Sequence, residues 1–110
     1  MTELELSILK WYTERHREIG LGGLGSSLDV LRREITEIGF FTYFKDSDLP
    51  LRIGKNGCIP GPFIHSSQAP SGAMTLLCIR DGKVEYLEVA ALEGSENANS
   101  IEDFELGDEF

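Results

Sequence analysis

The sequence predicts an α+β fold in which one amphipathic N-terminal helix packs on a mostly antiparallel β-sheet. Three observations predict it. Apolar residues recur at helical spacing over 2–19, aromatic and β-branched residues alternate over 38–44, and two apolar runs flank an Asp-Gly turn within 73–92. A chain of 110 residues is in the size range of one hydrophobic core, so we expect 1–110 to form a single domain, with 93–110 as an acidic C-terminal segment.

The helix is predicted to begin at Thr2, because Thr2 and Glu5 have the spacing of a capping box. Residues at spacings of three or four share one face of this helix: Leu4, Ile8, Trp11, Arg15 and Ile19. We expect Trp11 and Tyr12 to pack on the sheet, with Tyr12 partly exposed. The glycine-rich stretch 20–25 is predicted to end the helix, since glycine favours the positions that follow a helix.

Residues 38–44 are predicted to form a central strand, because both alternating faces of this stretch are largely apolar. The segment before it, 28–35, fits a helix capped by Ser27 and also fits an alternating strand; we favour a strand that pairs with 38–44. Further along, 54–57 has the composition of a tight hairpin turn. The prolines in 58–63 limit that stretch to an edge strand or an ordered loop, and 66–72 is predicted to be loop.

The clearest hairpin joins 73–79 to 84–92 through the turn at Asp81 and Gly82. In the returning strand the alternation places one set of residues on one face: Val84, Tyr86, Glu88 and Ala90. Glu88 is therefore expected to lie among apolar neighbours. After a polar stretch, the apolar residues of 101–106 are expected to add a short final segment.

The formal net charge of −9 is concentrated late in the chain. There are 12 acidic and 10 basic residues up to Leu92, but 7 acidic and no basic residues from Glu93 onward. Such a chain repels phosphates and anionic lipids, so we expect no nucleic-acid partner and no membrane partner, and a basic protein as the favoured kind of partner.

The N-terminal residues predict a cytoplasmic location. Glu3 and Glu5 stand where a signal peptide carries basic residues, and no apolar run approaches the roughly 20 residues that a bilayer requires. In that compartment cysteines stay reduced, so Cys58 and Cys78 are expected to act as small apolar residues.

Several short motifs resemble a family of small uncharacterised bacterial proteins. They are the aromatic strand 39–44, the turn 80–83 followed by Tyr86-Leu87-Glu88, and the stretch 101–104. The resemblance implies a bacterial, cytoplasmic origin. It implies no particular activity, because these motifs are strands, a turn and an edge.

Catalytic residue types are few in this sequence. Cys58 and His65 are seven residues apart, and a thiolate and an imidazole can act together as nucleophile and base if they meet. Glu88 can act as a general acid if burial raises its pKa. For all three a structural role is the more common outcome: a structural cysteine, a surface histidine, and an edge or pocket carboxylate paired with one of the arginines. No set of ligands has the spacing of a metal site, so we expect neither a metal nor another cofactor.

Two functions follow, from different classes. The first is a non-enzymatic protein-binding module, such as an immunity or inhibitor protein, whose acidic surface attracts a basic partner. Its candidate binding residues are Phe41, Tyr43, Glu102, Asp103 and Phe104. The second is a small-ligand or catalytic domain with a pocket between helix and sheet, for which the candidates are Cys58, His65 and Glu88. We favour the first, because no complete catalytic set is visible.

Overall fold

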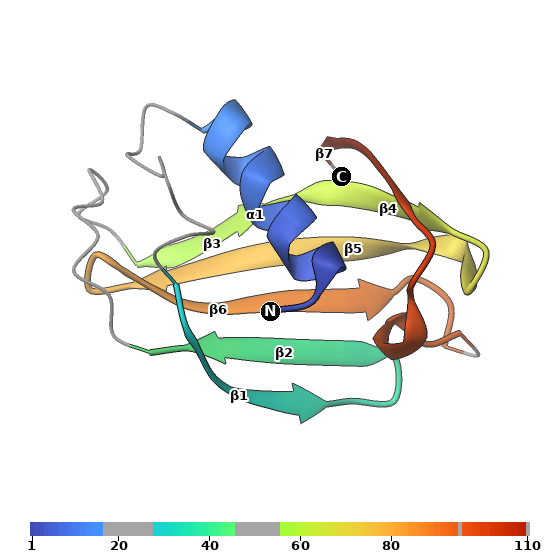
Figure 1. The fold of residues 1–110 in the computed structure, drawn as a ribbon, viewed down its shortest axis with the longest axis horizontal. Helices are drawn as coiled ribbons and strands as arrows, with labels where there is room; N and C mark the ends of the chain where they lie inside the picture. Colours follow the sequence, from blue (N-terminus) through green and yellow to red (C-terminus); the bar gives the residue numbers. More distant parts are fainter. Residues whose placement is uncertain (17–27, 46–55, 95, 110) are drawn as a thin grey trace.

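The computed structural model describes residues 1–16, 28–45, 56–94 and 96–109. In it one α-helix packs on a seven-stranded antiparallel sheet (Figure 1). In chain order the elements are α1 (Glu3–Arg15), β1 (Val30–Ile35), β2 (Gly39–Phe44), β3 (Gly57–Pro60), β4 (Pro62–Ser66), β5 (Ala69–Arg80), β6 (Lys83–Ala91), the 3-10 helix η2 (Ala98–Ser100) and β7 (Glu105–Glu109). The strand order is β1-β2-β6-β5-β4-β7, and β3 pairs with another part of β5. The α+β prediction is confirmed in its coarse form, with sheet as the main component.

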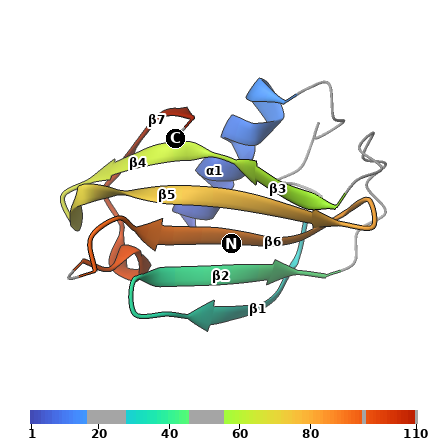
Figure 2. The same ribbon diagram turned by 180° about the vertical axis from the view of Figure 1, so that it is seen from behind.

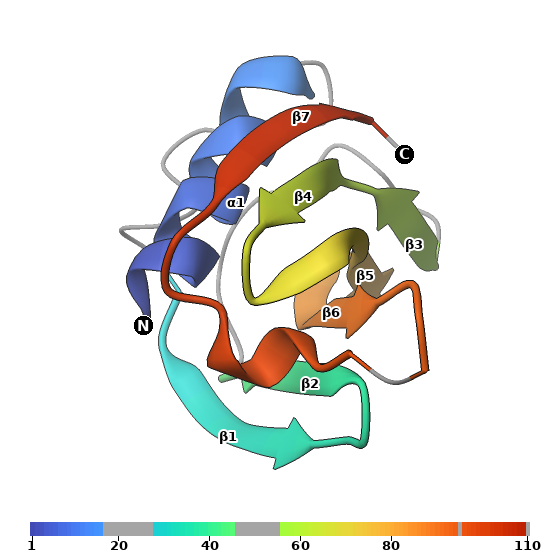
Figure 3. The same ribbon diagram turned by 90° about the vertical axis from the view of Figure 1, so that its right-hand side faces the viewer.

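The sheet curls, and α1 lies along the open side of the curl, between β1 and β7 (Figure 3). The inner face of the sheet and the helix enclose the core. Fully buried residues come from both, among them Ile8, Leu9, Ile64, Leu77, Leu87 and Val89. The outer face of the sheet carries no helix, and no described segment crosses it when the molecule is seen from behind (Figure 2).

The helix begins where the capping box predicts. The Thr2 hydroxyl accepts a hydrogen bond from the Glu5 backbone N–H, and the Glu5 carboxylate accepts one from the Thr2 backbone. Leu4, Ile8 and Trp11 are buried as expected, whereas the Arg15 side chain is exposed. Ile19 and the glycine-rich stretch 20–25 lie outside the described residues.

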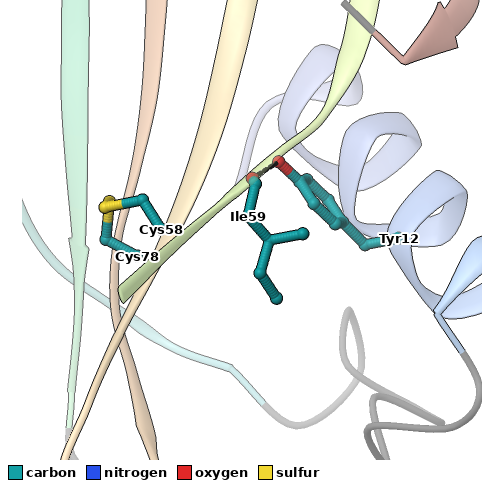
Figure 4. The surroundings of a disulfide bond; sticks show 4 residues. All are labelled: Tyr12, Cys58, Ile59 and Cys78. Carbon is teal, nitrogen blue, oxygen red and sulfur yellow. Dashed lines mark hydrogen bonds between the residues drawn. A yellow bond between two sulfur atoms is a disulfide. The ribbon is translucent and has the colours of Figure 1, made fainter. Parts of the chain in front are cut away.

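Tyr12, like Trp11, is buried in the core, which confirms that both pack on the sheet; the partial exposure allowed for Tyr12 is not found. Its hydroxyl donates a 2.7 Å hydrogen bond to the backbone carbonyl of Ile59 (Figure 4). A buried phenol costs little when its polar end has a partner, and this bond fastens α1 to β3.

β1 and β2 pair antiparallel, which confirms the strand interpretation of 28–35. β2 in turn pairs with β6, so it is the internal strand that its two apolar faces predict. Its faces are not buried equally. Phe40 and Phe44 face the core, while Phe41 and Tyr43 are partly exposed on the outer face.

The β5–β6 hairpin turns at Asp81 and Gly82, as expected. Both have positive φ, 53° and 74°, which an Asp-Gly pair tolerates. The alternation predicted for Val84 is wrong. The register shifts between Cys78 and Ile79, so Glu85 is an extra residue of β6 with no partner on β5, as in a β-bulge. Val84 therefore points to the core side of the sheet, where it is buried.

The stretch 58–72 holds more strand than predicted. Among the described strands β3 pairs with β5 alone, so the edge-strand prediction holds for it, whereas β4 lies between β5 and β7 and is not an edge strand. β5 already begins at Ala69, which reduces the predicted loop to a two-residue turn. The prolines are tolerated by position. Pro62 opens β4, and Pro70 precedes Ala73, the first residue of β5 in register with β6. Of the hairpin expected at 54–57, residues up to 55 lie outside the described part.

The acidic C-terminal segment is part of the fold. After η2, β7 pairs with β4, and Leu106 packs against the core. The indole N–H of Trp11 donates to the Gly107 carbonyl at 3.2 Å, and Arg15 forms an exposed ion pair with Asp108 at 3.3 Å. The acidic C-terminal segment thus contacts α1 through residues of β7.

Candidate functional site

An aromatic cluster lies on the outer face of the sheet. Phe41 and Tyr43 of β2 and Tyr86 of β6 are partly exposed, and their ring centroids are 5.4 to 6.3 Å apart. Strand alternation explains the arrangement, since residues two apart share a face and Tyr43 stands in register with Tyr86. We call this cluster the outer aromatic face. Sequence reasoning named Phe41 and Tyr43 but missed Tyr86, although it placed Tyr86 on the same face as Glu88.

An ion pair on β1 borders the outer aromatic face. The Arg32 guanidinium lies 4.0 Å from the centroid of the Tyr43 ring, and its Nε is 3.4 Å from the Glu34 carboxylate. The Tyr43 hydroxyl also donates to Glu34 at 3.4 Å. Desolvation, and then the nearby Glu34 carboxylate, raise the pKa of Tyr43 further above its ordinary value of 10.0. Its phenol is a hydrogen-bond donor at neutral pH.

Glu88 lies within the same face. Phe41 stands in register on one side of it and Leu76 on the other. Partial burial raises the pKa of Glu88, as the sequence suggested it could. In the described part of the chain no hydrogen-bond donor or cation pairs with this carboxylate.

The cysteines form a disulfide, which contradicts the expectation that they are reduced. Cys58 of β3 stands directly opposite Cys78 of β5, and antiparallel neighbours bring the two sulfurs together. The disulfide lies on the side of β3 away from Tyr12 (Figure 4). Cys58 is therefore bonded to Cys78 rather than available to His65 as a thiolate.

The three residues proposed for a pocket do not converge. Cys58 pairs into β5, His65 stands opposite Glu105 of β7, and Glu88 lies on β6 facing outward. His65 is exposed beside a shallow pocket of about 260 Å³, whose lining includes Asp103 and Phe104. Glu102 and Phe104 line a pocket with Phe40, on the inner side of β2, whereas Phe41 and Tyr43 face outward, so the candidate binding residues fall on two separate surfaces.

A larger pocket opens at the start of α1. It has a volume of about 490 Å³ and lies between the first helical turn, β1, β2 and the segment after η2. Its lining includes Arg33, Phe40, Glu102 and Phe104, but none of Cys58, His65 and Glu88. A pocket therefore lies between the helix and the sheet, but it is lined by other residues than the three predicted.

Beside this pocket Glu5 is a fully buried carboxylate. It accepts hydrogen bonds from Arg33 at 2.6 and 3.1 Å, from the Thr2 backbone at 2.7 Å, and from the Thr42 hydroxyl. Burial alone would raise the pKa of Glu5, but the bonds from Arg33, Thr42 and Thr2 outweigh it and hold the pKa below its ordinary value. The sequence analysis assigned Glu5 only a capping role. Its spacing of four and seven residues from Leu9 and Tyr12, which are also buried, is the signal that places Glu5 on the buried face of α1.

Neither a metal centre nor a membrane span is visible in the part of the chain that the structure describes. No three side chains among His, Cys, Asp and Glu gather there as possible metal ligands. No helix there combines the length and the apolar character needed to cross a bilayer.

The fold and the site define an α+β domain with a helix on the concave side of a curled antiparallel sheet and aromatic side chains on the convex side. Comparison with protein-family models, with curated proteins and with solved structures found no match in any of the three. The family resemblance seen in the sequence stays a prediction.

Proposed function

We propose that this chain is a non-enzymatic protein-binding module of the immunity or inhibitor type, and that the outer aromatic face is where its partner docks. The observation that carries the proposal is the cluster of Phe41, Tyr43 and Tyr86 on a sheet face that no described segment covers. Partly exposed aromatic residues that gather in one place are typical of protein interfaces, where Tyr and Trp contribute much of the binding energy.

Charge supports a basic partner. The net charge of −9 attracts a positively charged protein over distances longer than those of direct contact. Acidic side chains are exposed around β7, among them Glu102, Asp103 and Glu105. In this proposal the acidic residues speed the encounter, and the aromatic residues provide the contact that persists.

Binding measurements with substituted proteins test the proposal. A partner is captured from a lysate of the source organism, identified and purified, and its Kd is measured. Phe41→Thr and Tyr86→Thr keep strand propensity but remove the rings, so each should weaken binding at least about tenfold. Leu6→Gln is the matched control, because Leu6 is an exposed apolar residue on α1; its Kd should stay within about twofold of wild type.

Salt and hydrogen exchange complete the test. The association rate should fall as ionic strength rises, because exposed charges are screened over about 10 Å at 0.1 M salt. The complex should protect backbone amides of β2 and β6 from exchange. If both ring variants bind as wild type does, or protection falls on β7 alone, the outer aromatic face is not the docking surface.

A second function, small-ligand binding, is favoured by one observation. The pocket at the start of α1, about 490 Å³ in volume, is within the range of about 300–1,000 Å³ typical of ligand sites. A library screened by thermal shift against wild type and Ser100→Phe, which fills the pocket, tests it. A ligand that stabilises only the wild type supports this function, and equal shifts in both proteins exclude it.

A further inference from the structure

Glu88 is surrounded by uncharged residues on the outer face of the sheet. It stands in register between Phe41 and Leu76, and Tyr86 and Ala90 precede and follow it on the same face. The diagonal neighbours come from the adjacent register pairs: Tyr43, Cys78, Gly39 and Met74. None of these eight neighbours carries a charge at neutral pH, so the carboxylate has lost part of its hydration without gaining a cation.

Two arginines at the margins of this face, Arg32 and Arg80, are engaged with other residues. Arg32 is paired with Glu34 and lies over the Tyr43 ring. Arg80, at the end of the hairpin, is 3.6 Å from the Glu85 carboxylate. Glu88 is therefore an anionic group, flanked by aromatic rings, whose counterion the described residues do not supply.

The chemistry of this place fits a planar organic cation. A guanidinium group binds a carboxylate through two parallel N–H donors, is more weakly hydrated than an ammonium group, and stacks on aromatic rings. Phe41 stands in register with Glu88 and Tyr86 precedes it by two residues; both rings are partly exposed, so both offer aromatic surface to such a group. An anion or a purely apolar side chain would leave the carboxylate partly desolvated and unpaired.

We propose that Glu88 binds the guanidinium group of an arginine side chain of the partner protein, with the rings of Phe41 and Tyr86 packed beside it. This inference rests on the proposed function, and it names the chemical group that the outer aromatic face recognises. The surrounding apolar residues exclude water from the ion pair, which strengthens it relative to an exposed pair.

A peptide titration tests the inference without the natural partner. The ¹⁵N-labelled protein is titrated with acetyl-Gly-Arg-Gly-amide and with the same peptide carrying citrulline, which has the shape of arginine but no charge. The arginine peptide should shift the amide signals of Phe41, Tyr86 and Glu88 and bind at least about fivefold more tightly than the citrulline peptide. Glu88→Gln should abolish this preference. Glu85→Gln, which removes one charge from the same strand, should keep it.

Equal affinity for the two peptides, or a preference that survives in Glu88→Gln, would overturn the inference. Tighter binding of a trimethyllysine peptide than of the arginine peptide would also overturn it, in favour of a quaternary ammonium site. With the purified partner, a loss of affinity in Phe41→Thr but not in Glu88→Gln rejects the arginine site and leaves the proposed function standing. Wild-type affinity in both Phe41→Thr and Tyr86→Thr rejects the proposed function itself.

Discussion

Replacing Glu5 by glutamine perturbs the polar cluster that ties α1 to the sheet. Glutamine has nearly the same shape but only one acceptor oxygen, so its amide N–H₂ must face a donor of Arg33 or of Thr42. The four hydrogen bonds that the carboxylate accepts cannot all be kept. Arg33 also loses the anion that neutralises it.

The cost follows from these contacts. A hydrogen bond to a charged group contributes about 1.5–3 kcal/mol, and breaking a fully buried ion pair costs about 3–5 kcal/mol. The Arg33 side chain is 36% exposed, so water can replace part of what it loses. We expect Glu5→Gln to lower the free energy of unfolding by about 2–3 kcal/mol at neutral pH.

Urea denaturation followed by circular dichroism measures this loss. Glu3→Gln is the matched control, because Glu3 is an exposed glutamate of the same helical turn; it should change the free energy of unfolding by less than about 0.5 kcal/mol. In a double-mutant cycle, Glu5→Gln and Arg33→Met should couple by at least about 1 kcal/mol. A loss below about 0.5 kcal/mol for Glu5→Gln, or no coupling, would refute the reasoning.

The pH dependence of the same pair has a defined sign. The folded pKa of Glu5 is lowered, so its stabilisation is complete above the ordinary value of 4.5 and is lost as the pH falls through the folded pKa. The stability difference between wild type and Glu5→Gln should shrink over that acidic range.

Three further outcomes are expected. Cys58→Ser with Cys78→Ser should lower the free energy of unfolding by about 3 kcal/mol, from the entropy of opening a loop whose ends are 20 residues apart; dithiothreitol should destabilise the wild type but not this variant. Tyr12→Phe removes the hydrogen bond from the buried hydroxyl to the Ile59 carbonyl and should cost about 1 kcal/mol in urea denaturation, whereas Tyr43→Phe, which loses a longer and exposed bond, should cost less than about 0.5 kcal/mol. Glu88→Gln should stabilise the protein at neutral pH, because the folded pKa of Glu88 is raised and its ionisation opposes folding. In denaturation curves the gain should shrink as the pH falls through the folded pKa and be gone below the ordinary value of 4.5; a gain of the same size at all pH values would contradict this.

Elements with local causes could be predicted from the sequence. The capping box marked the start of α1, and the Asp-Gly pair marked the β5–β6 turn. Both depend on residues within four positions of one another. The inward turn of Val84 could not be predicted, because it depends on an extra residue, Glu85, opposite another strand.

The residues of the candidate site also divide into those with local sequence signals and those whose partners are distant in the chain. Alternation placed Glu88 among apolar neighbours, and the structure agrees. The polar cluster of Glu5 was missed, because its partners Arg33 and Thr42 are 28 and 37 positions away along the chain. Alternation alone also cannot tell which face of a sheet a helix will cover, and that decides whether Phe41 is core or surface.

The contact between Trp11 and Gly107 joins residues separated by 96 positions. Trp11 therefore leaves the ribosome long before its partner has been synthesised, and until Gly107 follows, the indole N–H lacks this acceptor. Folds that depend on such distant contacts form slowly, because a long loop must close before the contact stabilises it.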